Sequence, residues 1–198
     1  MIVLDVESSG VDWNANSILS LGAIDLENPT NQFYDECRVW DGAKIAQEAL
    51  DINGFTEEEA LSTDRKTEAE LITAFVAWAM DKPQNRTLCA QNVSFDYEFV
   101  RSACRRAGID FPFAKRTIDI HTLAWGHMSA RGVTPPVAKH HSALASRDVL
   151  AYCGLPEEAQ PHNALSGALW HAEVISRIAY NKKTVPDFEM YDIPWMKK

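Results

Sequence analysis

The first 40 residues carry apolar runs that predict three β-strands. Residues 2–6 and 18–25 are rich in β-branched and aliphatic side chains, and the polar stretch SSGVDWNAN separates them. Residues 32–40 follow with an approximate alternation of apolar and polar positions, which is typical of a strand with one buried face. Because the connecting loops are short, we expect these strands to form an antiparallel meander.

Helical spacing of apolar residues begins after this strand-rich segment. The stretch 67–80 places Leu71, Phe75 and Trp78 on one face, at the spacing of an amphipathic helix. Further helices are predicted over 44–50, 56–61, 95–107, 120–130, 143–153 and 163–181. Two more strands are predicted over 87–93 and 116–120.

Strands that cluster first and then alternate with helices indicate an α/β fold, in which a mixed sheet carries helices on its faces. A chain of 198 residues is long enough for one domain that covers both faces of such a sheet. We therefore predict a single domain over residues 1–181. Residues 182–198 show no periodic pattern and are predicted to form a C-terminal tail.

Composition and charge narrow the classes of function. The net charge of −9 argues against a general nucleic-acid coat protein, which would need a basic surface. It does not argue against an enzyme that binds a few nucleotides through divalent cations. No apolar run approaches the roughly 18–20 residues of a membrane helix, and no signal peptide is recognisable. The four cysteines are far apart, which suits reduced thiols in a cytoplasmic protein.

Two acids on the first predicted strand are the strongest chemical signal. Asp5 and Glu7 are two positions apart, so their side chains point to the same face, about 6.6–7 Å from each other. Two carboxylates at this distance repel each other unless a cation lies between them or one is protonated. Hard oxygen ligands favour Mg²⁺ or Mn²⁺ over zinc. Taken alone, the pair also fits acids that face solvent at a strand end.

Two later stretches carry further polar residues beside predicted elements. In QNVSFDYEF, Asp96 lies at the start of a helix that follows a strand, where an acid also interacts favourably with the helix dipole. In QPHNALSGALWHAEV, His162 lies in the loop before the last helix. Each has an ordinary explanation by itself, so their significance depends on the three stretches occurring together.

In order and spacing, the three stretches resemble the motifs of one nuclease family. LDVESSG resembles a first motif Asp-x-Glu, NVSFDYEF a second motif Asn-x-x-Phe-Asp, and HNALSGA a third motif His-x-Ala-x-x-Asp-Ala. The chain is therefore similar to the histidine subclass of the DEDD 3′–5′ exonucleases, which includes ribonuclease T, oligoribonuclease and the proofreading epsilon subunit of bacterial DNA polymerase III. The resemblance, over about residues 2–180, implies a ribonuclease H-like fold: a mixed five-stranded sheet with helices on both faces.

The resemblance also implies an activity and roles for individual residues. Family members hydrolyse the terminal phosphodiester bond of DNA or RNA with two Mg²⁺ or Mn²⁺ ions and release mononucleotides. By resemblance, Asp5 would bind both ions, Glu7 the first ion and Asp96 the second. His162 would act as general base on the bound water. The expected contacts to the terminal nucleotide are Ser8, Ser9, Gly10, Asn53 and Phe55.

Phe55 has an equal alternative as a core aromatic residue, while stacking on a base is the role that the resemblance implies. The expected partners are single-stranded DNA or RNA 3′ ends, and no membrane is involved. A homodimer, or a complex with a polymerase or repair protein, is compatible with the family.

One position departs from the family pattern. The aspartate that ends the third motif helps to hold the first ion in the family, and Gly167 stands in its place here. Three explanations are open: an introduced substitution that silences the enzyme, a natural loss, or compensation by another group, with His171 nearest by spacing. We predict that the chain hydrolyses DNA or RNA ends poorly or not at all. The alternative function is an inactive module of the same fold that binds nucleic-acid ends or a protein partner.

Overall fold

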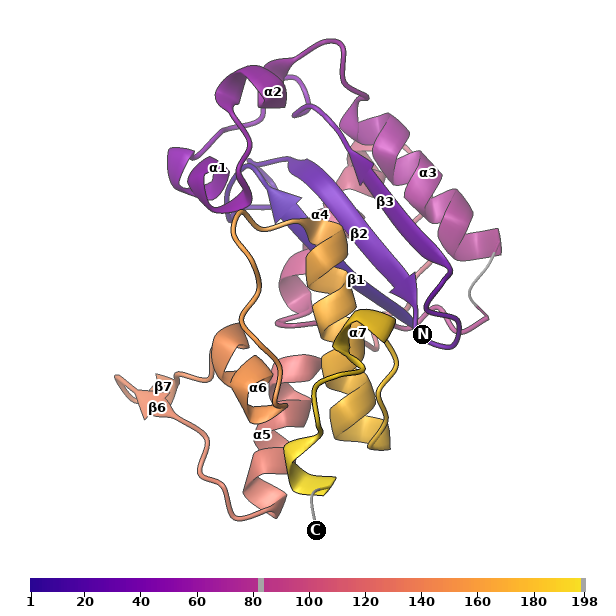
Figure 1. The fold of residues 1–198 in the computed structure, drawn as a ribbon. Coiled ribbons are helices and arrows are strands. Elements are labelled where there is room, and N and C mark those ends of the chain that lie inside the picture. Colours follow the sequence, from indigo (N-terminus) through magenta and orange to yellow (C-terminus); the bar gives the residue numbers. More distant parts are fainter. Residues whose placement is uncertain (82–83, 197–198) are drawn as a thin grey trace.

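A mixed sheet forms the centre of the molecule in the computed structural model, which describes residues 1–81 and 84–196 (Figure 1). Its strands are β1 (Ile2–Ser8), β2 (Ile18–Asp25), β3 (Gln32–Glu36), β4 (Leu88–Ala90) and β5 (Ile118–Asp119). They follow the order β3-β2-β1-β4-β5. The first three strands are antiparallel neighbours, whereas β4 and β5 run parallel to β1. The predicted meander and the predicted five-stranded mixed sheet are therefore confirmed.

Helices cover both faces of the sheet, as the resemblance implied. They are α1 (Gln47–Asn53), α2 (Glu57–Leu61), α3 (Glu68–Asp81), α4 (Ser94–Ala107), α5 (Ile120–Ala130), α6 (Ser146–Tyr152) and α7 (Ala164–Tyr180). On one face, Ile2, Leu4 and Val6 pack with buried side chains of α3 and α4. On the other face, Val3 and Ile24 pack with α5, α6 and α7. None of the described helices is long and apolar enough to cross a membrane.

Local sequence signals explain where several helices begin and end. Thr56 and Glu59 form a reciprocal capping box at the start of α2. Helix α4 ends at Gly108, whose left-handed backbone conformation glycine adopts at little steric cost. Asp119 accepts a hydrogen bond from the backbone at the start of α5 and another from Val93 N, so it stabilises the connection of β5 to its neighbours.

Some predicted boundaries are wrong. The third strand ends at Glu36 rather than at residue 40, because the backbone amides of Arg38 and Val39 donate to carbonyls outside the sheet. The strands predicted over 87–93 and 116–120 are shorter, with three and two residues. A small hairpin, formed by β6 (Val137–Ala138) and β7 (His141–Ser142), lies outside the predicted elements. These differences leave the order of the sheet unchanged.

The last described residues are attached to α7 by a buried arginine. Arg177 is fully buried and pairs with Glu173 at 2.6 Å. It also donates hydrogen bonds to the carbonyls of Phe188 and Tyr191, at 3.1 and 2.9 Å. The described part of the predicted tail therefore packs against the domain. The domain boundary at residue 181 stays a prediction.

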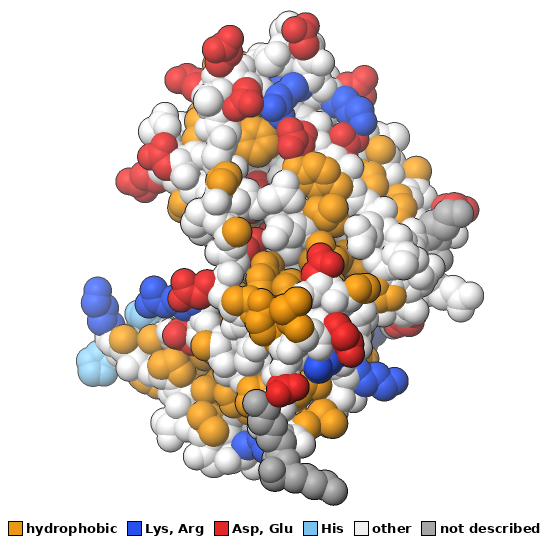
Figure 2. Space-filling view, in the orientation of Figure 1, with side chains coloured by type: hydrophobic (Ala, Val, Ile, Leu, Met, Phe, Trp, Pro, Cys, Tyr) orange, Lys and Arg blue, Asp and Glu red, His pale blue; other side chains and the backbone are white. Residues whose placement is uncertain are grey.

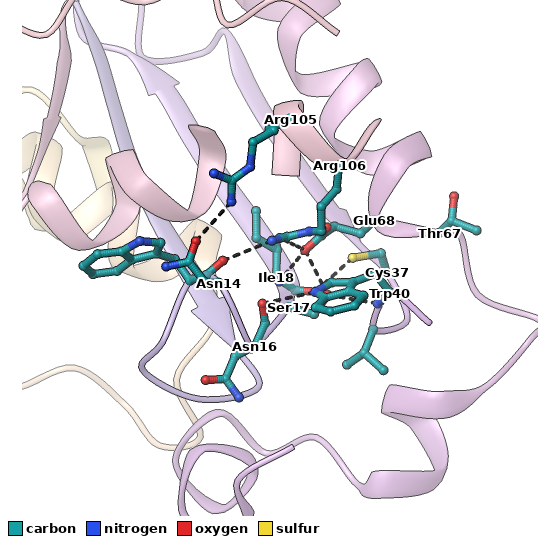
Figure 3. A network of polar contacts seen from close by, with 12 residues as sticks. Asn14, Asn16, Ser17, Ile18, Cys37, Trp40, Thr67, Glu68, Arg105 and Arg106 are labelled. Carbon is teal, nitrogen blue, oxygen red and sulfur yellow. Dashed lines mark hydrogen bonds and ion pairs between the residues drawn. The ribbon is translucent and has the colours of Figure 1, made fainter. Parts of the chain in front are cut away.

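A buried carboxylate joins α3, α4 and the start of β2 (Figure 3). Glu68 accepts hydrogen bonds from Ser17 Oγ and from Ile18 N, each at 2.9 Å. Arg106 binds the same carboxylate through two nitrogens, at 2.7 and 2.8 Å, and also donates to Trp13 O. Because these contacts restrain the loop between β1 and β2, they help to position the end of β1.

Removal of the arginine should therefore destabilise the protein. In Arg106→Met the buried Glu68 carboxylate loses its ion-pair partner, and we expect the free energy of unfolding to fall by about 3 kcal/mol. Arg101→Met is the matched control on the same helix: Arg101 pairs with Glu98 at the surface, so its loss should change stability by less than about 1 kcal/mol. Urea denaturation measures both variants. Equal, small effects would contradict the structural role of the Glu68–Arg106 pair.

Candidate active site

Strand β1 directs two acids to the face of the sheet that α7 covers. Asp5 pairs in register with Gly22 of β2, and Glu7 pairs with Ser20. The apolar residues that alternate with these acids point to the opposite face, into the core beneath α3 and α4. Both acids therefore share one face of the central strand.

Helix α7 approaches the sheet so closely that two positions have no room for a side chain. A Cβ atom on Gly22 would lie 2.2 Å from the Ala164 carbonyl oxygen, and a Cβ atom on Gly167 would lie 2.0 Å from Oδ2 of Asp5. Both distances are far shorter than van der Waals contact. Gly167, the position at which the chain departs from the family motif, thus lies directly against the Asp5 carboxylate.

Asp96 joins these acids from the first turn of α4. This helix follows β4, the parallel neighbour of β1, so its start lies beside the central strand. Burial raises the pKa of Asp96 well above its ordinary value, and the nearby charges of Asp5 and Glu7 raise it further. The structure therefore brings Asp5, Glu7 and Asp96 into one acidic cluster.

The carboxyl groups of the acidic cluster repel one another. Burial raises the pKa of Asp5, and the charges of His171 and His162 act in the opposite direction. Burial, followed by the charges of Asp5 and Glu158, raises the pKa of Glu7 to about 8. Within the described part of the chain, no lysine or arginine forms an ion pair with the acidic cluster. Without a cation, the cluster therefore favours protonated carboxyl groups beside two histidines.

The two histidines come from the loop before α7 and from α7 itself. The backbone amide of His162 donates to the Ile52 carbonyl at 3.1 Å, which ties this loop to α1. His171 lies one turn beyond Gly167, and its Nδ1 is 3.1 Å from the Leu4 carbonyl oxygen. Because a carbonyl only accepts hydrogen bonds, Nδ1 of His171 carries the proton.

The fold itself uses the polar groups of most residues expected to contact a nucleotide. Ser8 Oγ donates to Gly10 O at 2.6 Å, and Ser9 Oγ donates to the Lys44 carbonyl at 2.8 Å. Asn53 is buried, and its side chain donates to Ser8 O at 3.1 Å. These groups shape the loop after β1, and their contact with a substrate stays a prediction.

Phe55 is partly buried and contributes to both a core and a cavity wall. Its ring packs against a small core cluster that includes Leu50, and the guanidinium carbon of Arg65 lies 5.1 Å from the ring centre. Phe55 also lines a cavity of about 170 Å³, together with His162 and Asn163. Core packing is therefore part of its role, and stacking on a base stays a prediction.

A second cavity also contains His162 in its wall. It has a volume of about 310 Å³, and its lining includes Arg147, Glu157 and Glu158. Figure 2 shows this side of the molecule hollowed between α1 and the region of α6 and the β6–β7 hairpin, with basic side chains gathered at the hairpin. His162 is thus accessible from two cavities on the side of the molecule that carries the acidic cluster.

Glu158 is the residue of this region that the sequence motifs do not indicate. It lies in the loop between α6 and α7 and is partly buried. Burial, followed by the charge of Asp5, raises the pKa of Glu158 to about 7, while the charge of His171 acts in the opposite direction. The only sequence signal for it is the acidic pair Glu157 and Glu158 shortly before His162.

The acidic cluster is not arranged as a complete metal site. In residues 1–81 and 84–196, no group of three or more histidine, cysteine, aspartate or glutamate side chains has the arrangement needed to hold a metal ion. The Asp5 carboxylate instead lies against Gly167, where the aspartate side chain of the family motif would begin. The structure thus gathers the predicted acids without closing a coordination shell around them.

The sequence profile of the exonuclease family matches residues 2–175. The chain belongs to the DEDD exonuclease family. It is 28% identical over 193 residues to ribonuclease T of Yersinia pseudotuberculosis serotype O:1b, and the match covers 89% of this chain and 83% of that protein. It is also 26% identical over 164 residues to a PolC-type DNA polymerase III of Thermotoga petrophila. That match covers 76% of this chain but only 11% of the polymerase.

A solved structure shares the fold of this exonuclease. The nuclease domain of 3′hExo, described as a DEDDh family member bound to rAMP, matches with a TM-score of 0.69 and 14% identity, and 93% of each chain is covered. At this identity the likeness concerns the fold, and it confirms the ribonuclease H-like α/β architecture. The family match, over residues 2–175, identifies the chain as a member of the exonuclease family.

The protein without divalent cations should lose stability as the pH rises. The pKa of Glu7 is about 8 in the folded chain and 4.5 ordinarily, so between these values the folded state keeps a proton that the unfolded state releases. The free energy of unfolding should therefore fall with pH, by at most about 1.4 kcal/mol per pH unit for this one carboxyl. Urea denaturation in EDTA, between about pH 5.5 and pH 8, measures the slope.

Glu7→Gln removes one of the titrating groups and should make this slope less steep. Glu57→Gln, at an exposed position of α2, is the matched control and should leave the slope unchanged. If stability fell with pH equally in Glu7→Gln and in the parent chain, the buried carboxyl of Glu7 would not be the cause.

Proposed function

We propose that this protein is a metal-dependent 3′–5′ exonuclease that hydrolyses the terminal phosphodiester bond of DNA or RNA and releases mononucleotides. The acidic cluster is the observation that supports this function most. The charge of Asp5, on β1, raises the pKa of Glu7 on the same strand and of Asp96 on α4. Membership of the exonuclease family gives the class of reaction.

The donor chemistry of the acidic cluster fits divalent cations. Carboxylate oxygens are the hard ligands that Mg²⁺ and Mn²⁺ prefer. Positive charge at this position would also offset the repulsion that raises the pKa values of Glu7 and Asp96. Asp5, Glu7 and Asp96 would hold two ions. When bound, these ions would activate a water molecule and stabilise charge on the leaving oxygen.

His162 would remove the proton from the attacking water. It lies close enough to the acidic cluster that its charge lowers the pKa of Asp5. It also lines both cavities, so a substrate in either one could reach its ring. An imidazole can accept and release a proton near neutral pH, which suits a general base.

A single-stranded 3′ end would enter through the hollow beside His162. Residues 8–10 would contact the terminal sugar or phosphate, mainly through their backbone, and Asn53 would support this loop. Phe55 would stack on a base from the wall of the smaller cavity. The exposed residues 139–141, at the tip of the β6–β7 hairpin, would attract the phosphates of the strand. We propose DNA and RNA equally as substrates.

The partners and location of the enzyme are part of the proposal. A homodimer or a polymerase or repair partner is proposed, and the latter is supported by the similar segment in a PolC-type polymerase. We also propose a cytoplasmic location. The four cysteines are free and buried, which suits a reducing compartment.

The direction and the metal requirement are tested together. A single strand labelled at its 5′ end should shorten from its 3′ end in Mn²⁺ and leave a ladder of labelled strands one nucleotide apart. Asp5→Asn should lower this rate by about 100-fold or more, because a metal ligand is lost. Asp51→Asn, at an exposed position of α1, is the control and should keep the parent rate. Shortening from the 5′ end, or an unchanged rate in Asp5→Asn, would contradict the proposal.

Because of Gly167, this enzyme should degrade 3′ ends more slowly than a variant that carries the family aspartate at this position. Gly167→Asp should raise the rate of 3′-end degradation in Mn²⁺ by at least about tenfold. Gly167→Asn has the same shape without the charge and should give no gain. Because a Cβ atom in either variant displaces the Asp5 carboxylate, the pair isolates the effect of charge. Equal, robust rates in all three chains would show that this position does not limit the reaction.

A second candidate function is the binding of nucleic-acid ends without hydrolysis. Gly167 is the observation that favours it, because the family ligand at this position is missing. Fluorescence anisotropy with a labelled single strand separates the two functions. Binding of the strand without shortening at any Mn²⁺ concentration would support the inactive module.

A further inference from the structure

We propose that Glu158 provides the fourth carboxylate of the site, in place of the aspartate that is missing at Gly167. The inference rests on the proposed function, because it assigns Glu158 to the same divalent-cation site as Asp5. It also selects one explanation for the departure from the family motif. A glutamate on the neighbouring loop, and not His171, replaces the missing ligand for cation binding, while hydrolysis stays slower than with the family aspartate.

Glu158 has an oxygen that the fold does not use. Its Oε1 atom is buried and accepts no hydrogen bond from any described residue. Such acceptors are rare, because a buried polar group without a hydrogen-bond partner destabilises a protein. The adjacent Glu157 is exposed, so its carboxylate is solvated. A bound divalent cation would satisfy the Oε1 atom of Glu158.

The position of Glu158 places this oxygen beside the acidic cluster. The residue is four positions before His162, and both line the 310 Å³ cavity. The charge of Glu158 raises the pKa of Glu7, and the charge of Asp5 raises the pKa of Glu158, so Glu158 lies near both acids. Glu158 therefore approaches the cluster from the loop before α7, on the side that His162 occupies.

The packing of α7 explains why this carboxylate would come from a loop. The helix lies against β2 at Gly22 and against Asp5 at Gly167, without space for a side chain at either contact. A carboxylate at position 167 would require the Asp5 side chain to move. The loop that carries Glu158 reaches the same region without passing through this contact.

His171 fits the missing role less well than Glu158. Its Nδ1 donates to the Leu4 carbonyl at 3.1 Å, which fixes the ring against β1. A remaining imidazole nitrogen is a weaker match for Mg²⁺ or Mn²⁺ than a carboxylate oxygen. The charge of His171 lowers the pKa of both Asp5 and Glu158. The charge of His171 therefore favours the ionised forms of these two carboxyl groups.

Isothermal titration of the full chain with Mn²⁺ alone tests the role of Glu158. Glu158→Gln keeps the size of the side chain and should weaken Mn²⁺ binding by at least about tenfold. Glu157→Gln is the matched control on the same loop and should bind Mn²⁺ within about twofold of the parent chain. Thermal unfolding in EDTA verifies that both variants are folded. Unchanged Mn²⁺ affinity in a folded Glu158→Gln variant would overturn the inference.

A double variant tests whether carboxylates at positions 158 and 167 bind the same cation. If Glu158 replaces the family aspartate, Gly167→Asp should restore Mn²⁺ affinity in the Glu158→Gln background. The replacement would be contradicted if the double variant bound Mn²⁺ as weakly as Glu158→Gln while Gly167→Asp alone kept the parent affinity.

Asp5→Asn separates this inference from the proposed function. Loss of Mn²⁺ binding in Asp5→Asn with full binding in Glu158→Gln would overturn the role of Glu158 and leave the proposed function intact. Parent affinity in both variants would contradict the metal site itself.

Discussion

Repulsion among carboxyl groups at the end of β1 is the constraint on which the site depends. Asp5, Glu7 and Asp96 are brought together by the pairing of β1 with its neighbours and by the start of α4. Their burial and proximity favour the protonated forms of Glu7 and Asp96. Such a cluster persists only because the surrounding core holds it, and a divalent cation would turn its repulsion into attraction.

The supporting structure is built around this cluster. The Glu68–Arg106 pair restrains the loop after β1 from one face of the sheet. On the other face, contacts at Gly22 and Gly167 hold α7 against the strands. The second contact presses the helix against the Asp5 carboxylate. Gly167 therefore has two effects with one cause, the absence of a side chain. The family's carboxylate is missing, and α7 can pack closely against Asp5.

Sequence patterns could predict the long elements and the face that Asp5 and Glu7 share. The apolar runs of β1 and β2 are continuous, and a strand alternates with a period of two whatever surrounds it. The short strands β4 and β5 differ from their predicted lengths, because their ends depend on pairing with residues far along the chain. The approach of Asp96 depends on sheet order, which only the family resemblance supplied.

Glu158 could not be predicted, since a loop glutamate has no periodic pattern and its direction depends on how the loop before α7 folds. Its importance follows from an unsatisfied oxygen and from neighbours that are distant in sequence. The site therefore combines family motifs with a residue that lies outside them. Because one fold can carry different chemistries, the rate of the reaction depends on these individual residues.

The anomalous scattering of Mn²⁺ in crystals of the protein tests the proposed divalent-cation site most directly. We expect a strong anomalous peak within coordination distance of the carboxylates of Asp5 and Asp96, with the Asp5 side chain turned away from Gly167. Crystals saturated with Mn²⁺ that show no peak at the acidic cluster would contradict the proposed site.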